Sequence, residues 1–581
     1  MPKTFPGSVS GPLLFMISKD LTVKDRPVTV AIPKEFMAFL RTIPVSLAAV
    51  SAISPLAAQS ALDRVDPARV EERAQEAPPA LDGQVAVALE PKDAAADGPR
   101  IAVGAIDLAG LRALPRSDFA DIIEAYVGRS LSGDELAELA DRLARRARET
   151  YPLASAIIED QTLRAGVLRV RIDEGTVDEV VLEGTTNAAV MATVRPLATG
   201  RPVTRAEFDR HLLLADDIDG VSLGKVRVER REGRNVLLVP VSYSRFSAQV
   251  SIDNDSTRPL GPHELIASGR ASGVLDDDDS LQALVLNAVP DLEELTFARL
   301  RYANRISAAG TILTLTGSIS NTMPGAYLAP LDIHGQGWFA SAGLQHPLVR
   351  SRRTNLWIDA AIGYRALEQD RAGVIARRDR LTTMQVGVFG NAALAGGNLR
   401  AAATVSRGLD LLGATGFGDP LSSREDADGT FTKVQLSAEW RGRLVGAFGA
   451  HVALRSQLAS QPLLVAEELG VGGAQFVRGY DYSERTGDEG ALGYLELSYT
   501  HDKTLGPIDG FELYAFADGG EAINLADGFG GGTLFSSGGG IRLDVDRRTD
   551  AGLELAVPLS GDRYETDDQG PRVRFSITRY F

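Results

Sequence analysis

The sequence predicts a transmembrane β-barrel of about sixteen antiparallel strands, preceded by two α+β domains and an N-terminal helix. Three observations carry this prediction. After residue 245, short segments alternate between apolar and polar side chains, which is typical of strands with one apolar face. Before it, two units of about 70 residues repeat one order of strands and helices. The chain ends in "PRVRFSITRYF", where Val573, Phe575, Ile577 and Phe581 share a face.

The composition narrows the class of protein. At 581 residues the chain is long enough for several domains, and it has no cysteine, which indicates avoidance of thiols in an oxidising compartment. Its formal net charge of −16 argues against a nucleic-acid partner, because no basic face is paired with stacking aromatics. The mature region holds no uninterrupted apolar run of transmembrane-helix length, so a helical membrane protein is not expected.

Residues 1–60 predict an N-terminal extension and a signal peptide. From Met37 the chain reads "MAFLRTIPVSLAAVSAISPLAAQS", in which one arginine precedes an apolar stretch and a small-residue cleavage site near Ala58 to Ser60. The alternative is a short buried helix, which the two prolines in the stretch disfavour. We therefore expect Met37 to be the true start and residues 1–36 to be an overrun.

Residues 61–76, "ALDRVDPARVEERAQE", predict a short helix. Asp66 is its N-cap, Pro67 its first helical residue, and Arg69 follows in the first turn. The residues alone leave a solvated tail as the ordinary interpretation, because the helix is polar on all sides. Residues 77–99 are mainly Ala, Pro, Asp and Gly with little periodicity, which predicts a linker.

Residues 100–175 and 176–244 each predict a small α+β domain. In the first, "IAVGAIDLAG" alternates like a strand, "SDFADIIEAYVG" and "SGDELAELADRLARRARETY" are helical, and two strands follow. Ser132 and Glu135 have the spacing of a capping box, whereas Ser117 is a plausible cap without it. The second unit repeats the order of the first, so each is expected to place helices on one face of a sheet.

Residues 245–581 predict the barrel itself. In "TILTLTGSI", for example, Leu315 and Thr316 fall on opposite faces. A soluble sandwich alternates in the same way. A membrane barrel is favoured because the strand number is even, because short turns alternate with longer loops such as 365–380 and 408–430, and because the last strand has an apolar face. A closed barrel leaves no free sheet edge in lipid.

Two short motifs stand in the barrel region. Between the eleventh and twelfth strands, "VGGAQFVRGYDYSERTGDEG" contains Val477, Arg478, Gly479 and Tyr480. On the thirteenth strand, "FADGG" contains Phe516, Asp518 and Gly519. Strand alternation turns Phe511 and Leu513 toward lipid, so Phe516 and Asp518 face the lumen.

Together these residues resemble the outer-membrane transporters of two-partner secretion, the haemolysin secretion/activation family. The resemblance covers the chain from the predicted helix to the C-terminus. The α+β units are similar to POTRA domains, periplasmic repeats that bind unfolded polypeptide. "YPLASAIIEDQTLRAGVLRVRIDEG" is similar to the end of the first POTRA domain, and "VSIDNDSTRPLGPHEL" to the motif that opens the barrel. Tyr151, Asp255 and Thr257 depart mildly from the family pattern.

The resemblance implies that the loop with Arg478 folds into the lumen. An arginine there and an aspartate on the inner wall can pair, and partial shielding from water makes the pair stronger than an exposed one, which contributes about 0–1 kcal/mol. A guanidinium fork also fixes orientation, which a lysine does not. We therefore expect Arg478 to meet Asp518. The resemblance also implies that the helix at 61–76 plugs the lumen.

The function implied by the resemblance is translocation of an unfolded exoprotein with an N-terminal secretion domain. The barrel would lie in the outer membrane of a Gram-negative bacterium, as a monomer surrounded by lipid and lipopolysaccharide, with the POTRA domains in the periplasm. An assembly factor or insertase shares the barrel, the POTRA fold and the loop motif, but two POTRA domains and a plug-like helix argue against it. An adhesin or a passive porin does not explain the POTRA repeats.

Nothing in the sequence points to catalysis. The six histidines are scattered singly, and neither a zinc motif nor a phosphate-binding loop is present. The acidic run Asp276 to Asp279 lacks the ligand spacing of a calcium loop. We therefore predict no enzymatic activity, no catalytic residue, no metal and no cofactor.

Overall fold

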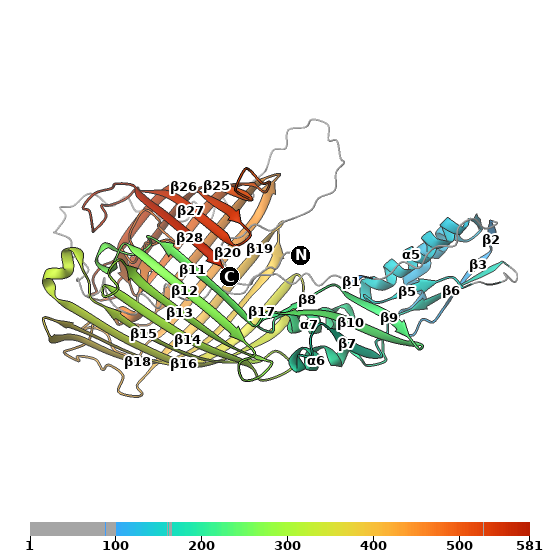
Figure 1. Cartoon of the computed structure of the whole chain (residues 1–581), viewed down its shortest axis with the longest axis horizontal. Helices are drawn as coiled ribbons and strands as arrows, with labels where there is room; N and C mark the ends of the chain where they lie inside the picture. Colours follow the sequence, from blue (N-terminus) through green and yellow to red (C-terminus); the bar gives the residue numbers. More distant parts are fainter. Residues whose placement is uncertain (1–86, 89–99, 160, 162–165, 527) are drawn as a thin grey trace.

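The computed structural model describes residues 87–88, 100–159, 161, 166–526 and 528–581. Two small α+β domains extend from one end of a large closed barrel (Figure 1). Within these residues no helix is both long and apolar enough to cross a bilayer. The predicted signal peptide and the helix predicted at 61–76, with Asp66, Pro67 and Arg69, lie outside the described residues.

The first α+β domain packs its helices on a small sheet. A three-stranded sheet has the order β3-β6-β5, and β2 pairs with β4. The long helix α5 begins with the predicted capping box of Ser132 and Glu135 and buries Leu139 and Leu143 in the domain core. Ser117 lies inside a 3-10 turn and makes no cap hydrogen bond. The elements are β2 (Ile101–Val103), β3 (Ala105–Ala109), η1 (Arg116–Phe119), α4 (Ala120–Tyr126), β4 (Arg129–Leu131), α5 (Gly133–Thr150), β5 (Ser155–Ile157) and β6 (Val167–Asp173).

The second α+β domain repeats this arrangement next to the barrel. Its sheet has the order β1-β9-β10-β7, and β8 also pairs with β10. The strand β1 (Val87–Ala88) comes from the predicted linker and pairs in parallel with β9. The elements after the linker are β7 (Glu179–Glu183), α6 (Ala188–Val194), η2 (Arg195–Leu197), α7 (Arg205–Asp216), β8 (Val221–Leu223), β9 (Val226–Arg231) and β10 (Arg234–Tyr243).

Sixteen antiparallel strands form the barrel, as predicted, and β28 pairs with β11 to close it. The strands are β11 (Phe246–Asp253), β12 (His263–Ser272), β13 (Asp279–Val289), β14 (Leu295–Arg305), β15 (Ile312–Thr322), β16 (Ile333–Arg350), β17 (Thr354–Arg371), β18 (Val374–Leu394), β19 (Gly397–Leu409), β20 (Thr432–Val445), β21 (Phe448–Ala459), β24 (Glu489–His501), β25 (Gly510–Ile523), β26 (Gly532–Asp546), β27 (Thr549–Pro558) and β28 (Arg572–Tyr580). The connections contain η3 (Arg258–Leu260), η4 (Ala326–Leu331), η5 (Val465–Glu467) and the short strands β22 (Leu469–Val471) and β23 (Arg485–Gly487).

The strands turn apolar side chains outward and polar ones inward. On β25, Leu513 is exposed on the outer surface, whereas Phe516 and Asp518 are buried inside. Outward leucines such as Leu315 and Leu495 are likewise exposed. Large exposed apolar side chains on successive strands are what a lipid-facing surface requires.

The prediction of a loop at residues 365–380 is wrong. Strands β17 and β18 continue through it and meet at the turn of Ala372 and Gly373, which have φ angles of 51° and 75°. Positive φ at both central residues is typical of a tight hairpin turn. Charged side chains suggested a loop, but strands that extend beyond the bilayer keep their pairing and carry such residues in water. A true loop separates Leu409 from Thr432.

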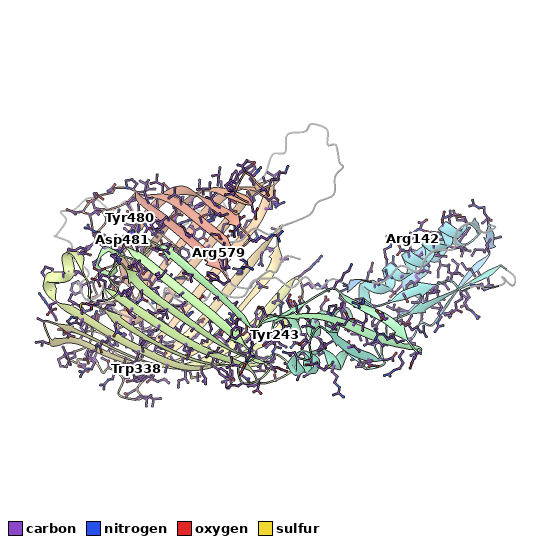
Figure 2. All side chains as sticks on the ribbon, viewed as in Figure 1. Arg142, Tyr243, Trp338, Tyr480, Asp481 and Arg579 are labelled. Carbon is purple, nitrogen blue, oxygen red and sulfur yellow. The ribbon has the colours of Figure 1, made fainter. Side chains whose placement is uncertain are left out.

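The second α+β domain is fixed to the barrel by ion pairs. Its last strand, β10, leads through Tyr243 to the first barrel strand (Figure 2). The contacts join α7 and the turn after it to one end of the barrel: Arg350 with Asp217 at 2.6 Å, Arg352 with Asp209 at 2.8 Å, and Arg270 with Asp219 at 3.0 Å. These pairs identify the barrel end that faces the two domains.

Candidate functional site

The segment 460–488, between β21 and β24, folds into the barrel and is called the lumen loop here. Its short strands β22 and β23 pair from Leu469 with Gly487 to Val471 with Arg485. Beyond this hairpin the chain is mostly buried from Phe476 to Glu484, and its apolar side chains pack on inward-facing residues of the wall. This cluster contains Ala453, Leu469, Val471, Phe476, Val477, Tyr480, Leu492, Ala522 and Leu534. The inward-folded loop implied by the family resemblance is therefore present.

Glycines allow the lumen loop to turn and to approach the wall. Gly472 has a φ of 116°, and a Cβ there would lie 2.2 Å from the carbonyl oxygen of Asp481. A Cβ on Gly479 would lie 2.8 Å from the backbone nitrogen of Pro558 and from Ser536 Cβ. Only glycine fits such close backbone approaches.

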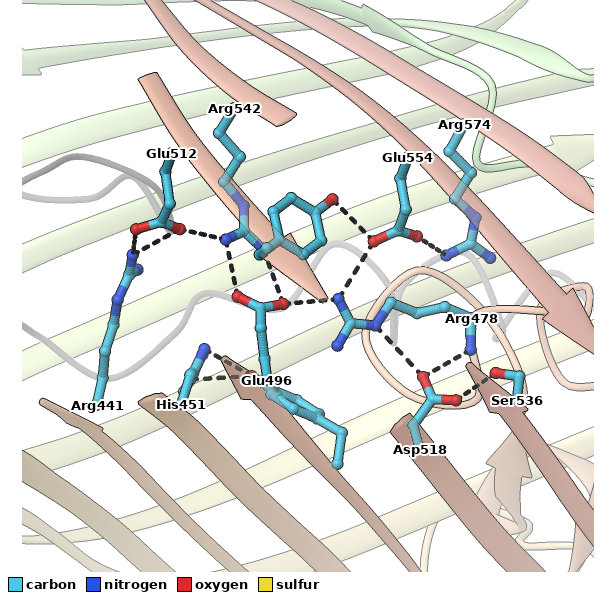
Figure 3. Close-up of polar contacts among 12 residues, drawn as sticks. Arg441, His451, Arg478, Glu496, Glu512, Asp518, Ser536, Arg542, Glu554 and Arg574 are labelled. Carbon is cyan, nitrogen blue, oxygen red and sulfur yellow. Dashed lines mark hydrogen bonds and ion pairs between the residues drawn. The ribbon is translucent and has the colours of Figure 1, made fainter. Parts of the chain in front are cut away.

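Arg478 meets the expected aspartate at the tip of the lumen loop. Its backbone N–H and its Nε both donate to Asp518 Oδ2, at 3.0 Å and 3.3 Å (Figure 3). The side chains of Arg478 and Asp518 are 5% and 0% exposed, so the pair is shielded from water. A buried, hydrogen-bonded pair is strongly destabilised when one partner is removed.

The same guanidinium binds two further carboxylates. Arg478 Nη1 donates to Glu496 Oε2 at 2.9 Å and to Glu554 Oε2 at 3.2 Å. These acids come from β24 and β27, and Asp518 comes from β25. Sequence reasoning missed both glutamates. Their signal was available, because each is an acid at an inward position of an alternating strand, but the sequence does not show which inward acids lie beside the loop tip.

Two aromatic rings hold the guanidinium between them. The Arg478 guanidinium carbon lies 3.6 Å from the centre of the Phe516 ring and 4.9 Å from that of Tyr494. Cation–π contacts of this kind favour a planar guanidinium in a desolvated site. The phenylalanine of the "FADGG" motif is therefore part of the arginine's binding site.

Ser536 on β26 links the loop backbone to the aspartate. Its hydroxyl donates to Asp518 Oδ1 and accepts the N–H of Gly479 at 2.9 Å. Gly519, in contrast, is not part of this contact. A Cβ on Gly519 would lie 2.4 Å from the Phe535 ring, so the glycine leaves room for that ring.

A line of alternating charges extends from this contact along the inner wall. Arg542 pairs with Glu496 at 2.8 Å and also with Glu512, and Arg574 lies 3.8 Å from Glu554. Glu496 and Glu554, which both bind Arg478, thus each have a second arginine partner. Among the described residues, the only cation paired with Asp518 is Arg478. The contact that depends entirely on the loop is therefore the one with Asp518.

The two residues after Gly479 tie the loop to the last strand and to the connection that precedes it. The Tyr480 side chain is buried, and its hydroxyl donates to the carbonyl of Gly561 at 3.1 Å. Arg572 on β28 donates to the Tyr480 carbonyl at 2.9 Å and pairs with Asp481. Tyr480 and Asp481 lie toward the barrel end that is farther from the α+β domains (Figure 2).

No cluster of three or more His, Asp or Glu side chains within the described residues is placed to hold a metal ion. The acids at the loop tip are occupied by arginines instead. The arrangement can therefore fix a polypeptide loop to a wall.

Comparisons with known proteins identify this architecture. The model of the haemolysin secretion/activation protein ShlB/FhaC/HecB family matches residues 233–543, and the ShlB-type POTRA domain matches residues 101–175. The heme/hemopexin transporter protein HuxB of Haemophilus influenzae (strain 86-028NP) is 23% identical over 402 residues, covering 66% of this chain and 69% of HuxB. The outer membrane transporter CdiB of Escherichia coli is 23% identical over 502 residues, covering 80% and 81%.

Solved structures share the fold. CdiB from Escherichia coli has a TM-score of 0.63 at 19% identity, over 86% of this chain and 94% of that chain. BamA from Haemophilus ducreyi lacking POTRA domains 1–3 has a TM-score of 0.53 at 12% identity, over 83% and 100%. BamA is the more distant of the two.

The barrel end that binds the second POTRA domain faces the periplasm, and the lumen loop enters from the extracellular end. The chain belongs to the haemolysin secretion/activation protein ShlB/FhaC/HecB family and is an outer-membrane transporter of two-partner secretion, which translocates an exoprotein to the cell surface.

Proposed function

We propose that Arg478 fixes the lumen loop to the barrel wall and that the exoprotein passes through the lumen while this loop stays in place. The observation that carries the proposal is one buried guanidinium bound by carboxylates from three strands. Each strand contributes part of the binding site, so the loop tip has a single well-defined position. A loop held in this way leaves a defined path beside it for an extended polypeptide.

In this proposal the POTRA domains capture the exoprotein in the periplasm. The partner is an unfolded exoprotein with an N-terminal secretion domain. An extended segment of it would add to a sheet edge, for which β3 and β5, the outer strands of the first sheet, are candidates. Passage would be driven by folding of the exoprotein outside the cell, which requires no nucleotide site.

The helix at 61–76 is proposed to plug the lumen until the exoprotein displaces it. A helix that is polar on all sides suits the line of charges on the inner wall, where it would replace water. Deleting residues 61–76 should raise the conductance of the inserted protein in a planar bilayer. Unchanged conductance would count against a plug.

The outer surface of the barrel is proposed to contact lipid and lipopolysaccharide as a monomer. Support comes from the exposed apolar side chains on successive strands and from the closed barrel, which leaves no strand edge for a second copy. The mass of the detergent-solubilised protein, measured by light scattering with the detergent contribution subtracted, checks this. A mass of two chains would contradict it.

The experiment that tests the role of Arg478 compares two variants with a matched control. Arg478→Ala and Asp518→Asn should abolish surface display of the exoprotein, while heat-modifiable migration shows that the barrel is inserted. Arg579→Gln is the control, because Arg579 forms an exposed ion pair with Asp546 on the same barrel. Normal secretion by both lumen variants would refute the proposed role.

A further inference from the structure

A second arginine contacts the root of the lumen loop, which is the place where its two arms leave the barrel wall, at Glu468 and Asp488. Arg424 belongs to the extracellular loop between β19 and β20, and its side chain is 8% exposed. Its Nε and Nη2 donate to the two carboxylate oxygens of Asp426, at 3.0 Å and 2.9 Å. Its Nη1 donates to Glu468 at 2.9 Å and to Asp488 at 2.7 Å. One guanidinium thus holds three carboxylates.

Glu468 and Asp488 belong to opposite arms of the lumen loop. Glu468 directly precedes Leu469, and Asp488 directly follows Gly487, the first pair of the β22–β23 hairpin. The two acids therefore face each other across the two arms, one step outside the hairpin. Like charges opposite each other on neighbouring strands destabilise the pairing. Arg424 donates to both carboxylates, and its positive charge offsets part of their repulsion.

Burial makes the repulsion between the two carboxylates stronger. The side chains of Glu468 and Asp488 are 3% and 0% exposed, so water does not screen their repulsion. Asp488 is also fixed by the backbone N–H groups of Leu463 and Leu525, each at 2.7 Å. The nearby acid Glu467 has cations of its own and does not share Arg424. These are Lys433 at 2.7 Å and Arg365 at 3.2 Å.

The hairpin itself is too short to keep the arms together. Each of its strands has three residues, and an isolated two-stranded hairpin is at best marginally stable in water. The tip with Arg478 begins seven residues after Val471 and depends on both arms for its position. A contact that joins the two arms at the root therefore adds stability that the short hairpin does not provide.

We propose that Arg424 is a positioning residue that clasps the two arms of the lumen loop at the extracellular mouth and thereby keeps Arg478 within reach of Asp518. The proposal rests on the fixed loop proposed above and adds its second anchor. Without Arg424, Glu468 and Asp488 repel each other in a buried place, and the arms separate. The loop then loses its single position although Arg478 and Asp518 are both intact.

Accessibility of a cysteine in the loop measures the opening of the arms. The chain has no native cysteine, and Ser483 is a buried residue in the return arm, so Ser483→Cys provides a single, nearly isosteric thiol. In the full-length protein in detergent, a bulky maleimide should label this thiol slowly. Arg424→Gln should increase the labelling rate roughly tenfold or more, because it removes the cation that lies between two facing buried carboxylates.

Removing the repulsion should restore the slow rate. Glu468→Gln is chosen for this, because the Asp488 carboxylate also accepts two backbone N–H groups that an amide cannot both satisfy. The double variant R424Q/E468Q should therefore label nearly as slowly as the parent. Arg378→Gln is the matched control, since Arg378 forms a partly exposed pair with Glu368 on the extracellular strand extensions.

Two results would overturn the proposal. One is slow labelling in the R424Q variant with a heat-modifiable, folded barrel. The other is fast labelling in R424Q/E468Q, which would show that lost packing rather than charge opens the arms. If R424Q alone fails to insert, the double variant decides: insertion with slow labelling supports the clasp, and failure to insert contradicts it. Secretion by the Arg478 and Asp518 variants reports on the fixed tip separately.

Discussion

At the residue scale, the Arg478 site is distinguished by the number of groups that one guanidinium satisfies. Three carboxylates and two aromatic rings surround it in a buried place. An exposed ion pair contributes about 0–1 kcal/mol, whereas removing one partner of a buried cluster costs about 3–5 kcal/mol. The planar fork and the stacking faces are specific to arginine.

Arg478→Lys should therefore reduce secretion to a level close to that of Arg478→Ala. A lysine keeps the charge but cannot reach the carboxylates of three strands at once or stack on Phe516. The measurement is the amount of protease-accessible exoprotein on cells that contain equal amounts of inserted barrel. Near-normal secretion by the lysine variant would show that charge alone is sufficient.

The buried carboxyl of Asp216 in α7 should make the stability of the second POTRA domain depend on pH. Burial raises the pKa of its carboxyl from the usual 3.8 to about 6. A carboxyl with a raised folded-state pKa carries no penalty well below pH 3.8, where it is protonated in both states. It destabilises the fold increasingly as the pH rises from 3.8 to about 6. The full cost above that pH is about 2–3 kcal/mol.

Asp216→Asn should thus stabilise the domain most at pH 8 and clearly less at pH 4.5, which lies between the unfolded-state and folded-state pKa values. The amide keeps an oxygen to accept the N–H of Leu223, which the carboxylate accepts at 2.7 Å. The readout is hydrogen exchange of the α7 amides at the two pH values, corrected for the intrinsic rate. Equal effects of the substitution at both pH values would contradict the raised pKa.

The pairing of Arg478 with Asp518 was predictable because the family resemblance implies a loop inside the lumen and alternation along one strand assigns the aspartate to the lumen. Glu496 and Glu554 were not, since their proximity depends on how strands far apart in sequence are staggered around the barrel. The clasp at Arg424 lies in a loop of irregular structure, where no periodicity exists to read. Alternation along a strand shows which side chains face the lumen. Which of these side chains lie next to each other is determined only when the barrel closes.

At the element scale, the strand assignments were more accurate than the loop assignments. All sixteen predicted barrel strands are present, and several of them show clean two-residue alternation in the sequence. The hairpin around Ala372 and Gly373 was misassigned because its strands continue into water, where the outward side chains become polar. The apolar signal ends at the membrane surface, but backbone pairing does not.

The acidic turn "DEG" at the end of the first POTRA domain has a physical explanation. The buried Glu174 carboxylate accepts the N–H groups of Arg112, Ala113 and Leu114 at distances of 2.8–3.0 Å. Gly175 has a φ of 79°, and a Cβ there would lie 2.6 Å from the backbone of Leu153. The turn thus closes the loop after β3 onto β6.

Glu174→Gln should loosen this loop while the rest of the domain stays folded. An amide has one acceptor oxygen, so one or more buried N–H groups lose their partner at a cost of about 1–3 kcal/mol. Hydrogen exchange of the amides at 112–114 should become faster. Glu159→Gln, in an exposed pair with Arg171, is the control, and equal exchange in the two variants would contradict this role.

At the scale of the whole molecule, the second POTRA domain and the barrel form one unit through three aspartate–arginine pairs. The strongest burial is that of Arg350, whose side chain is 7% exposed and which donates to Asp217 through both Nε and Nη2. Fork-shaped pairs of this kind fix orientation. The POTRA domains are therefore held in a defined direction below the periplasmic mouth.

The double variant R350Q/R352Q should widen the range of positions of the POTRA domains. Distances between spin labels on the second POTRA domain and on a periplasmic turn of the barrel should become broader. Arg353→Gln is the control, because Arg353 is an exposed neighbour in the same turn. Distributions as narrow as those of the control would mean that packing alone sets the orientation.

In the proposed mechanism the exoprotein passes while the lumen loop stays fixed to the wall. Gln475 in the loop and Arg455 on β21 are in contact, with 3.1 Å between Arg455 Nη2 and Gln475 Oε1. Replacing both by cysteine and joining them with a short thiol-reactive linker pins the loop tip. The pinned transporter should still display the exoprotein at the level of its unlinked form. Loss of display on linking, with the barrel still inserted, would contradict it.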